Sequence, residues 1–161
     1  GHGQARQSGE LLPPAGARAA FERGAVDAWV IWDPFQAAAE KQIGARLLAD
    51  GKGVVNNHAF FLAARDYVER HPDVVKLLFE AIPAQGQWIV EHYGEAAAAL
   101  APLQGLDPTI IEQGLRRFTH DFRPISDAVL TEQQKIADVF FDLKLSPKPV
   151  NVKDAVPKST P

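Results

Sequence analysis

Trp29 and Trp32 stand near the end of an apolar run that closes with Asp33 and Pro34, where a predicted strand meets a predicted helix start. The run 25–32 is apolar on both alternating faces apart from one aspartate, which is typical of a strand covered by helices on both sides. Residues three apart on a strand face opposite sides. We assign Trp29 to the core. Trp32 adjoins a predicted helix start, where an aromatic wall next to free N–H groups makes an anion pocket, so the pattern leaves two interpretations of Trp32 open, a structural residue and a ligand contact.

Asp33 and Pro34 carry the start signals of that helix. An aspartate before the first turn accepts a free backbone N–H, and a proline at the first helical position loses no needed donor. The carboxylate of Asp33 would oppose an anionic ligand but would suit a ligand's ammonium group. We therefore expect Asp33 to act mainly as a cap, and we place Asp33 and Pro34 with Trp32 at the border of the ligand.

Patterns typical of catalysis are absent from the sequence. The chain has no cysteine, and no two of its five histidines are spaced four apart as a helical metal pair would be. It also lacks a Gly-x-Ser-x-Gly elbow, a phosphate-binding Gly-x-x-x-x-Gly-Lys loop and a Gly-x-Gly-x-x-Gly fingerprint. We therefore predict no catalytic residue, no metal site and no cofactor.

Composition narrows the possible partners. Seventeen Lys and Arg residues against 20 Asp and Glu residues give a net charge of −3, which disfavours a nucleic-acid partner. No apolar stretch is long enough to predict a membrane span. Residues 1–10 are mostly small and polar and lack an initiator methionine, so we interpret them as a processed or cloning-derived end.

The elements expected around the site follow a strand, helix, strand, helix order. A strand ending at Leu12 leads through a proline pair to a helix over 15–23, and the strand 25–32 leads to a helix over 34–43. That order is typical of a parallel sheet, in which ligands lie outside the carboxyl ends of the strands. Pro14 and Ala15 would therefore meet Trp32 at one crevice.

The rest of the chain is predicted to be mostly helical. Residues 58–64 indicate another buried strand, and Pro83 with Gly86 should break or kink the helix that begins at Pro72. Further helices are expected over 94–103, from Pro108 with Asp107 as its cap, and after Ser126, followed by an extended tail over 146–161.

Several motifs together resemble a known receptor family. They are Leu12-Pro13-Pro14-Ala15, Asp27-Ala28-Trp29 with Trp32-Asp33-Pro34-Phe35, Phe60-Phe61-Leu62, Gln87-Trp88-Ile89-Val90 and Leu145-Ser146-Pro147-Lys148-Pro149. The chain is similar to the second half of the aliphatic-sulfonate-binding periplasmic proteins of ABC importers, relatives of the taurine and nitrate receptors. The resemblance covers residues 12–156, about half the length of such receptors.

The resemblance implies an α/β fold, part of a type II periplasmic binding protein, helix-rich with a short, mainly parallel sheet. Residues 11–48 would end the second lobe, and residues 49–161 would form the carboxyl-terminal part of the first. The implied partners are a small anion such as an alkanesulfonate or taurine and an ABC permease in the membrane, with a periplasmic location and no enzymatic activity. The ligand contacts would be Trp32, Asp33, Pro34, Pro14 and Ala15.

Two other functions stay open from the sequence. The first is an enzyme of the same fold, of the thiamine-pyrimidine synthesis type, and the second is a helical interaction module that binds no small molecule. Sheet edges and apolar helix faces without the other half of the fold would be exposed, and we expect such a chain to dimerise or exchange elements.

Overall fold

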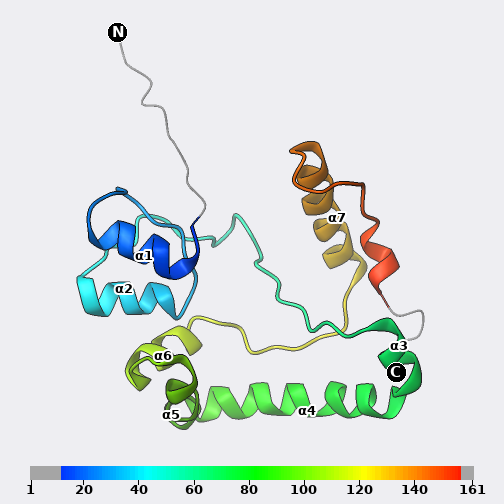
Figure 1. Ribbon diagram of the computed structural model, residues 1–161. Helices are drawn as coiled ribbons and strands as arrows, with labels where there is room; N and C mark the ends of the chain where they lie inside the picture. The colour runs from blue at the N-terminus through cyan, green and yellow to red at the C-terminus, as the bar shows by residue number, and fades with distance from the viewer. Residues whose placement is uncertain (1–11, 157–161) are drawn as a thin grey trace. The chain divides into compact units, whose positions relative to one another are not determined.

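The computed structural model describes residues 12–156 and is rich in helix (Figure 1). The predicted processed end at residues 1–10 and the end of the tail lie outside the described residues. These residues form two compact units, one of residues 12–57 with 92–119 and the other of residues 58–91 with 120–156. The predicted helix-rich character is confirmed.

Four helices make up the first unit: α1 (Pro14–Glu22), α2 (Phe35–Ile43), α5 (Tyr93–Gln104) and α6 (Pro108–Leu115). Their core consists of two isoleucines of α6 set against alanines. Ile110 packs on the alanines of α2, and Ile111 packs on those of α5. Small alanine side chains let the backbones approach closely, so α6 is held between α2 and α5, which it contacts on both sides.

The helix ends of this unit follow the predicted signals. The carboxylate of Asp107 accepts the N–H of Thr109 at 2.8 Å and caps α6. Gly44 and Gly105 end α2 and α5 with φ of 66° and 64°, a left-handed conformation that favours glycine. The predicted cap at Asp107 and the predicted end of the helix over 34–43 are confirmed, whereas the end of α5 at Gly105 lies just beyond the predicted range 94–103.

The second unit holds α3 (Arg65–Arg70), α4 (Pro72–Glu91), α7 (Asp127–Asp142) and the 3-10 helix η1 (Val152–Ala155). The ring of Phe122 meets Phe61 and Phe79 edge to face, with centroids 5.4 and 5.2 Å apart. The hydroxyl of Ser126 accepts the N–H of Val129 at 3.3 Å, which confirms the predicted cap of α7.

Of the two predicted outcomes at Pro83 and Gly86, the break is wrong, because α4 runs through both residues, and the kink stays a prediction. An interior proline removes a helical hydrogen bond, but packing on each side of it can hold the helix together. Phe79 packs on Phe122 on one side. Gly86 provides contact on the other, where an added Cβ would lie only 2.4 Å from the carbonyl oxygen of His120. Gly86 therefore allows α4 to pass close to the backbone of His120, and it does not end the helix.

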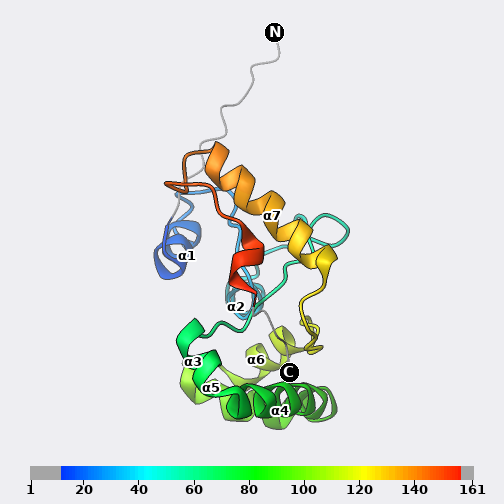
Figure 2. The ribbon, with the colours of Figure 1, turned by 90° about the vertical axis from the view of Figure 1, so that its right-hand side faces the viewer.

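The tail after α7 is fastened by one side chain, that of Gln134. Its amide donates to the carbonyl of Val150 at 2.9 Å, and its oxygen accepts the N–H of Val152 at 2.9 Å. Figure 2 shows η1 beside α7, with which it is in contact. The tail was predicted to be extended throughout. That prediction is wrong for residues 152–155, which form a 3-10 turn.

The predicted parallel sheet is not confirmed, because no strand forms within residues 12–156. The segments 28–32 and 58–64 have no regular secondary structure, and instead of being buried they leave Val30 97% and Leu62 91% exposed. A strand requires a hydrogen-bonded neighbour, and the described part of the chain supplies none to either segment. Trp29 is half-buried against Phe21, with ring centroids 6.2 Å apart.

Candidate functional site

The indole of Trp32 is open to solvent at the start of α2. It is 58% exposed and meets the ring of Phe35 edge to face, with centroids 6.3 Å apart. An exposed aromatic ring at a helix start can form one wall of a ligand site. The structure thus leaves Trp32 accessible, while its contact with a ligand stays a prediction.

Most of the N–H groups at the start of α2 already have partners. The N–H of Gln36 donates to the carbonyl of Trp32 at 3.2 Å, and that of Ala37 donates to the carboxylate of Asp33 at 3.1 Å. Among the first three amides of α2, only that of Phe35 lacks a partner within residues 12–156. The predicted start is wrong by one position, because Pro34 is the N-cap residue and α2 begins at Phe35, while Asp33 just before it still accepts an N–H of the first turn. Few donors remain here for an anion.

The start of α1 is more open than the start of α2. No side chain caps it, and within the described chain the N–H groups of Ala15 and Gly16 have no acceptor. A guanidinium nitrogen of Arg18 donates to the side-chain oxygen of Gln42 at 2.7 Å, which joins α1 to α2 in the same unit. The sequence pointed to Pro14 and Ala15, but it did not identify Gly16 as a donor.

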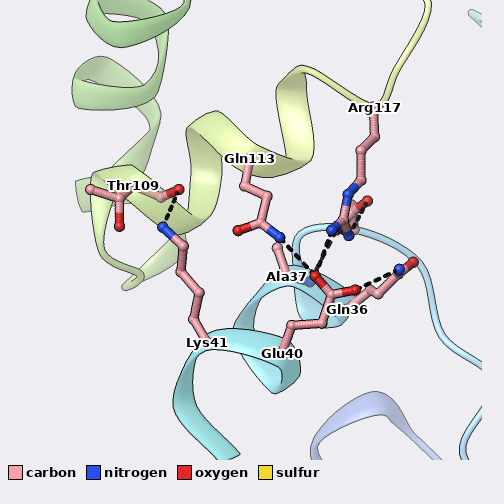
Figure 3. A network of polar contacts seen from close by, with 8 residues as sticks. Gln36, Ala37, Glu40, Lys41, Thr109, Gln113 and Arg117 are labelled. Atoms are coloured by element: carbon pink, nitrogen blue, oxygen red, sulfur yellow. Dashed lines mark hydrogen bonds and ion pairs between the residues drawn. The ribbon is translucent and has the colours of Figure 1, made fainter. Parts of the chain in front are cut away.

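A polar network links the start of α2 to the end of α6 (Figure 3). The carboxylate of Glu40 accepts hydrogen bonds from Arg117 at 2.5 Å, from Gln113 at 2.7 Å and from Gln36 at 3.0 Å. Arg117 also donates to both oxygens of Asp33, at 3.3 and 3.5 Å. The side chain of Asp33 is only 7% exposed, so its charge is already satisfied by the protein.

This network changes the proton affinity of its members. Burial raises the pKa of Glu40, but the hydrogen bonds from Arg117, Gln36 and Gln113 and the charge of Arg117 outweigh it and lower the pKa below its ordinary value. For Arg117, burial alone would lower the pKa, whereas Glu40 and Asp33 raise it overall. Both groups therefore stay charged at neutral pH. Sequence reasoning missed this network, because its members come from two distant parts of the chain.

A shallow hollow of about 440 Å³ lies beside the network, lined by Lys41, Thr109, Glu112, Gln113, Arg116 and Arg117. The positively charged side chains that line the hollow already have partners within the protein. Lys41 donates to the carbonyl of Thr109 at 3.0 Å, and Arg116 pairs with Glu112 at 2.7 Å and lies over the ring of Tyr93. None of the five predicted ligand residues lines it. We therefore regard the hollow as a feature of the α2 and α6 interface.

Two features are absent from the part of the chain that the structure describes, a metal-binding cluster and a membrane-spanning helix. Residues 12–156 contain no group of three or more His, Cys, Asp or Glu side chains placed to hold a metal ion. None of the helices in this part of the chain is both long and apolar enough to cross a membrane.

Comparison with known families and proteins supplies the context for these features. The NMT1-like family matches residues 10–103. An aliphatic sulfonates-binding protein of Escherichia coli (strain K12) is 35% identical over 146 residues, which cover 90% of this chain and 46% of that protein. One of Bacillus subtilis (strain 168) is 34% identical over 90% of this chain and 44% of its own length.

Two solved structures are similar to this one. The periplasmic aliphatic sulphonate binding protein SsuA from Escherichia coli superposes with a TM-score of 0.82 at 34% identity, over 92% of this chain and 49% of its own. The alkanesulfonate-binding protein SsuA from Xanthomonas axonopodis pv. citri, bound to MOPS, gives a TM-score of 0.76 at 36% identity, over 91% and 51%. The chain therefore spans about half the length of the curated relatives it matches.

Proposed function

The chain belongs to the NMT1-like family, and from this premise we propose that it is part of the solute-binding component of an ABC importer. The component would bind an aliphatic sulfonate or a similar small anion and deliver it to the permease. The observation that carries the proposal is the match of about nine-tenths of the chain, in sequence and in backbone trace, to proteins named for binding aliphatic sulfonates or alkanesulfonates.

The local chemistry at the two helix starts supports an anion as ligand. Ala15 and Gly16 offer N–H groups without acceptors in the described chain, at the positive end of the dipole of α1. Trp32 offers an exposed ring for the carbon chain of a sulfonate. Pro14 belongs to the same first turn and fixes its φ.

Asp33 and Pro34 contribute to the proposed site by position. The carboxylate of Asp33 is held by Ala37 and Arg117 and is almost fully buried, so it neither repels a sulfonate strongly nor reaches an ammonium group. Its proposed role is to fix the start of α2, and with it the place of Trp32. Pro34 follows at the same turn.

The proposal is binding without turnover. Curated relatives at 34–35% identity are named as binding proteins, and a receptor that releases its ligand unchanged to a permease needs no nucleophile, metal or cofactor. A periplasmic location is part of the proposal, supported by the periplasmic SsuA of Escherichia coli. The predicted division into lobes at residues 11–48 and 49–161 is also part of the proposal. Nothing in the comparisons supports the predicted dimerisation or exchange of elements.

The test is isothermal titration of a receptor in which this chain replaces the matching half of the Escherichia coli relative. We expect one tight class of ligand among alkanesulfonates, taurine, nitrate and sulfate. Changing Trp32→Ala should weaken sulfonate binding about 10-fold or more, because burying a large apolar side chain is worth about 1.5–3 kcal/mol.

The matched control is Leu48→Ala, which removes an exposed apolar side chain in the same unit and should leave binding unchanged. A receptor that melts cooperatively but gives no heat of binding with any sulfonate would contradict the proposed ligand. Equal affinity in the Trp32→Ala variant would remove Trp32 from the site while leaving the ligand class intact.

A further inference from the structure

The exposed indole of Trp32 has few contacts of its own that fix its direction. Within residues 12–156 it meets one aromatic ring, that of Phe35, edge to face at 6.3 Å, and Trp32 is 58% exposed. The carbonyl of Trp32 accepts the N–H of Gln36 at 3.2 Å, so its backbone is bonded to the first turn of α2. Because the rotamers open to a side chain depend on its backbone, the direction of the indole depends on how firmly this turn is held.

The end of α6 holds this turn through charge. The side chain of Asp33, next to Trp32, is only 7% exposed, and Arg117 donates to both of its oxygens at 3.3 and 3.5 Å. Moving a carboxylate that is almost shielded from water away from its cation is costly. The same guanidinium donates to Glu40 in the second turn of α2 at 2.5 Å. Arg117 therefore ties the residue before α2 to the body of that helix.

A glycine of α6 holds the same turn through shape. A Cβ added at Gly114 would lie 3.3 Å from the Cβ of Asp33, which is tighter than ordinary van der Waals contact, and 3.6 Å from the Cα of Pro34. A side chain at this position would push the turn away from α6 by a few tenths of an ångström. Gly114 and Arg117 therefore act on the same two residues, beside Trp32.

We propose that Arg117 is a positioning residue for the aromatic wall of the sulfonate site: through Asp33 it fixes the indole of Trp32, and it thereby sets the preference for sulfonates with longer alkyl chains. The inference rests on the proposed function. Arg117 does not contact the ligand, since its guanidinium is engaged by Asp33 and Glu40. A long alkyl chain lies on the indole, whereas methanesulfonate has too little apolar surface to use it.

Loss of this tether should cost affinity only where the ligand uses the ring. When the indole takes several directions, a long-chain sulfonate binds the fraction of molecules in which the ring is in place, and its apparent affinity falls by that fraction. Ordering one large side chain on binding corresponds to about 3-fold to 10-fold in affinity. The affinity for methanesulfonate should stay within about 2-fold, because this ligand binds whatever the direction of the ring.

The first experiment needs no ligand. The 161-residue chain is labelled with fluorine-substituted tryptophan, which gives one fluorine NMR resonance for each of its three tryptophans, and Trp32→Phe identifies the resonance of Trp32. We expect Arg117→Met to broaden or split this resonance and Gly114→Ala, which removes no charge, to shift it. The matched control Arg116→Met should leave it unchanged, because Arg116 pairs with Glu112 on α6 and not with the turn before α2.

The second experiment measures ligand preference in the receptor in which this chain replaces the matching half of the Escherichia coli relative. Isothermal titration gives the dissociation constants of hexanesulfonate and methanesulfonate. Arg117→Met should lower the preference for hexanesulfonate by about 3-fold to 10-fold, and Arg116→Met should leave it unchanged. A merely structural role of Arg117 would weaken both ligands equally and would leave their ratio as it is.

Two results would overturn the inference. The first is a Trp32 resonance that stays sharp and in place in Arg117→Met, or in Gly114→Ala should Arg117→Met not fold. The second is an unchanged preference for hexanesulfonate in an Arg117→Met receptor that binds sulfonates. A receptor that binds no sulfonate would refute the proposed function together with the chain-length preference, and the fluorine measurement would still decide whether Arg117 holds Trp32 in place.

Discussion

Replacing Arg117 should destabilise the first unit more than replacing any other solvent-accessible arginine of that unit. The change Arg117→Met takes away the donor to Glu40 and to Asp33 and leaves the nearly buried carboxylate of Asp33 with only the N–H of Ala37. A hydrogen bond to a charged group is worth about 1.5–3 kcal/mol. The side chains of Arg117 and Glu40 are 34% and 23% exposed, so solvent screening reduces this, and we expect a loss of about 2 kcal/mol.

The measurement is urea unfolding followed by circular dichroism, together with a double-mutant cycle that adds Glu40→Gln. A loss of about 2 kcal/mol lowers the melting temperature of a chain of this size by about 4–8 °C. The coupling energy between the two positions should be about 1 kcal/mol, because Glu40 accounts for only part of what Arg117 contacts. The coupling should shrink in high salt.

The neighbouring residue provides a matched control. Arg116 pairs with Glu112 four positions earlier on α6, and its side chain is 57% exposed. Arg116→Met should therefore cost only about 1 kcal/mol, from the exposed pair with Glu112 and the contact with the ring of Tyr93 together. The reasoning is refuted if Arg117→Met costs no more than Arg116→Met, or if the coupling with Glu40→Gln falls below about 0.3 kcal/mol.

The same network predicts a dependence on pH. Because the folded chain lowers the pKa of Glu40 below its ordinary 4.5, the ionised carboxylate stabilises the fold above that value, and this contribution is lost as pH falls through the folded pKa. The unchanged chain should therefore lose stability in acid more steeply than the Glu40→Gln variant. Parallel acid titrations of the two proteins would contradict the account.

Two further substitutions test the second unit. Gly86→Ala should destabilise it by about 1–3 kcal/mol in thermal melts, since the new Cβ would collide with the carbonyl of His120. The control Gly94→Ala has open space at its Cβ and should be neutral or slightly stabilising in the same melts. Gln134→Ala should release the tail and raise the rate of proteolysis after the lysines of the tail several-fold. The control Gln133→Ala should not raise it, because Gln133 lines the neighbouring apolar hollow of about 290 Å³ and does not hold the tail backbone. Equal proteolysis of the two glutamine variants would show that Gln134 does not fasten the tail.

Helix boundaries were predictable because their signals are local. The caps Asp107 and Ser126 and the end at Gly44 act within one turn of the residue itself, so the sequence contains all the information needed. Gly86 was misinterpreted for the opposite reason. Its role depends on a loop that follows it by more than 30 positions, and a lone glycine does not reveal such a neighbour.

The candidate site was predictable in part. The pattern around Trp32 and Asp33 located a helix start to within one residue, with an aspartate that accepts an N–H of the first turn and an exposed indole beside it. It could not show that Arg117, 84 positions away, satisfies the charge of Asp33. The apolar run 25–32 indicated a strand on the correct physical grounds, but a strand also requires a neighbour, and within residues 12–156 none is present.

The contact of Gln134 with the tail has a geometric consequence. Along an extended chain, consecutive residues point their backbone groups to opposite sides, so sliding the tail by a single position would turn both of its bonded groups away from the glutamine. The slide would also displace the carbonyl of Asp154 from Arg65, which donates to it at 2.5 Å. One alignment of the tail on α7 is thus selected over its neighbours, and the position of η1 is set by a side chain 18 residues before it.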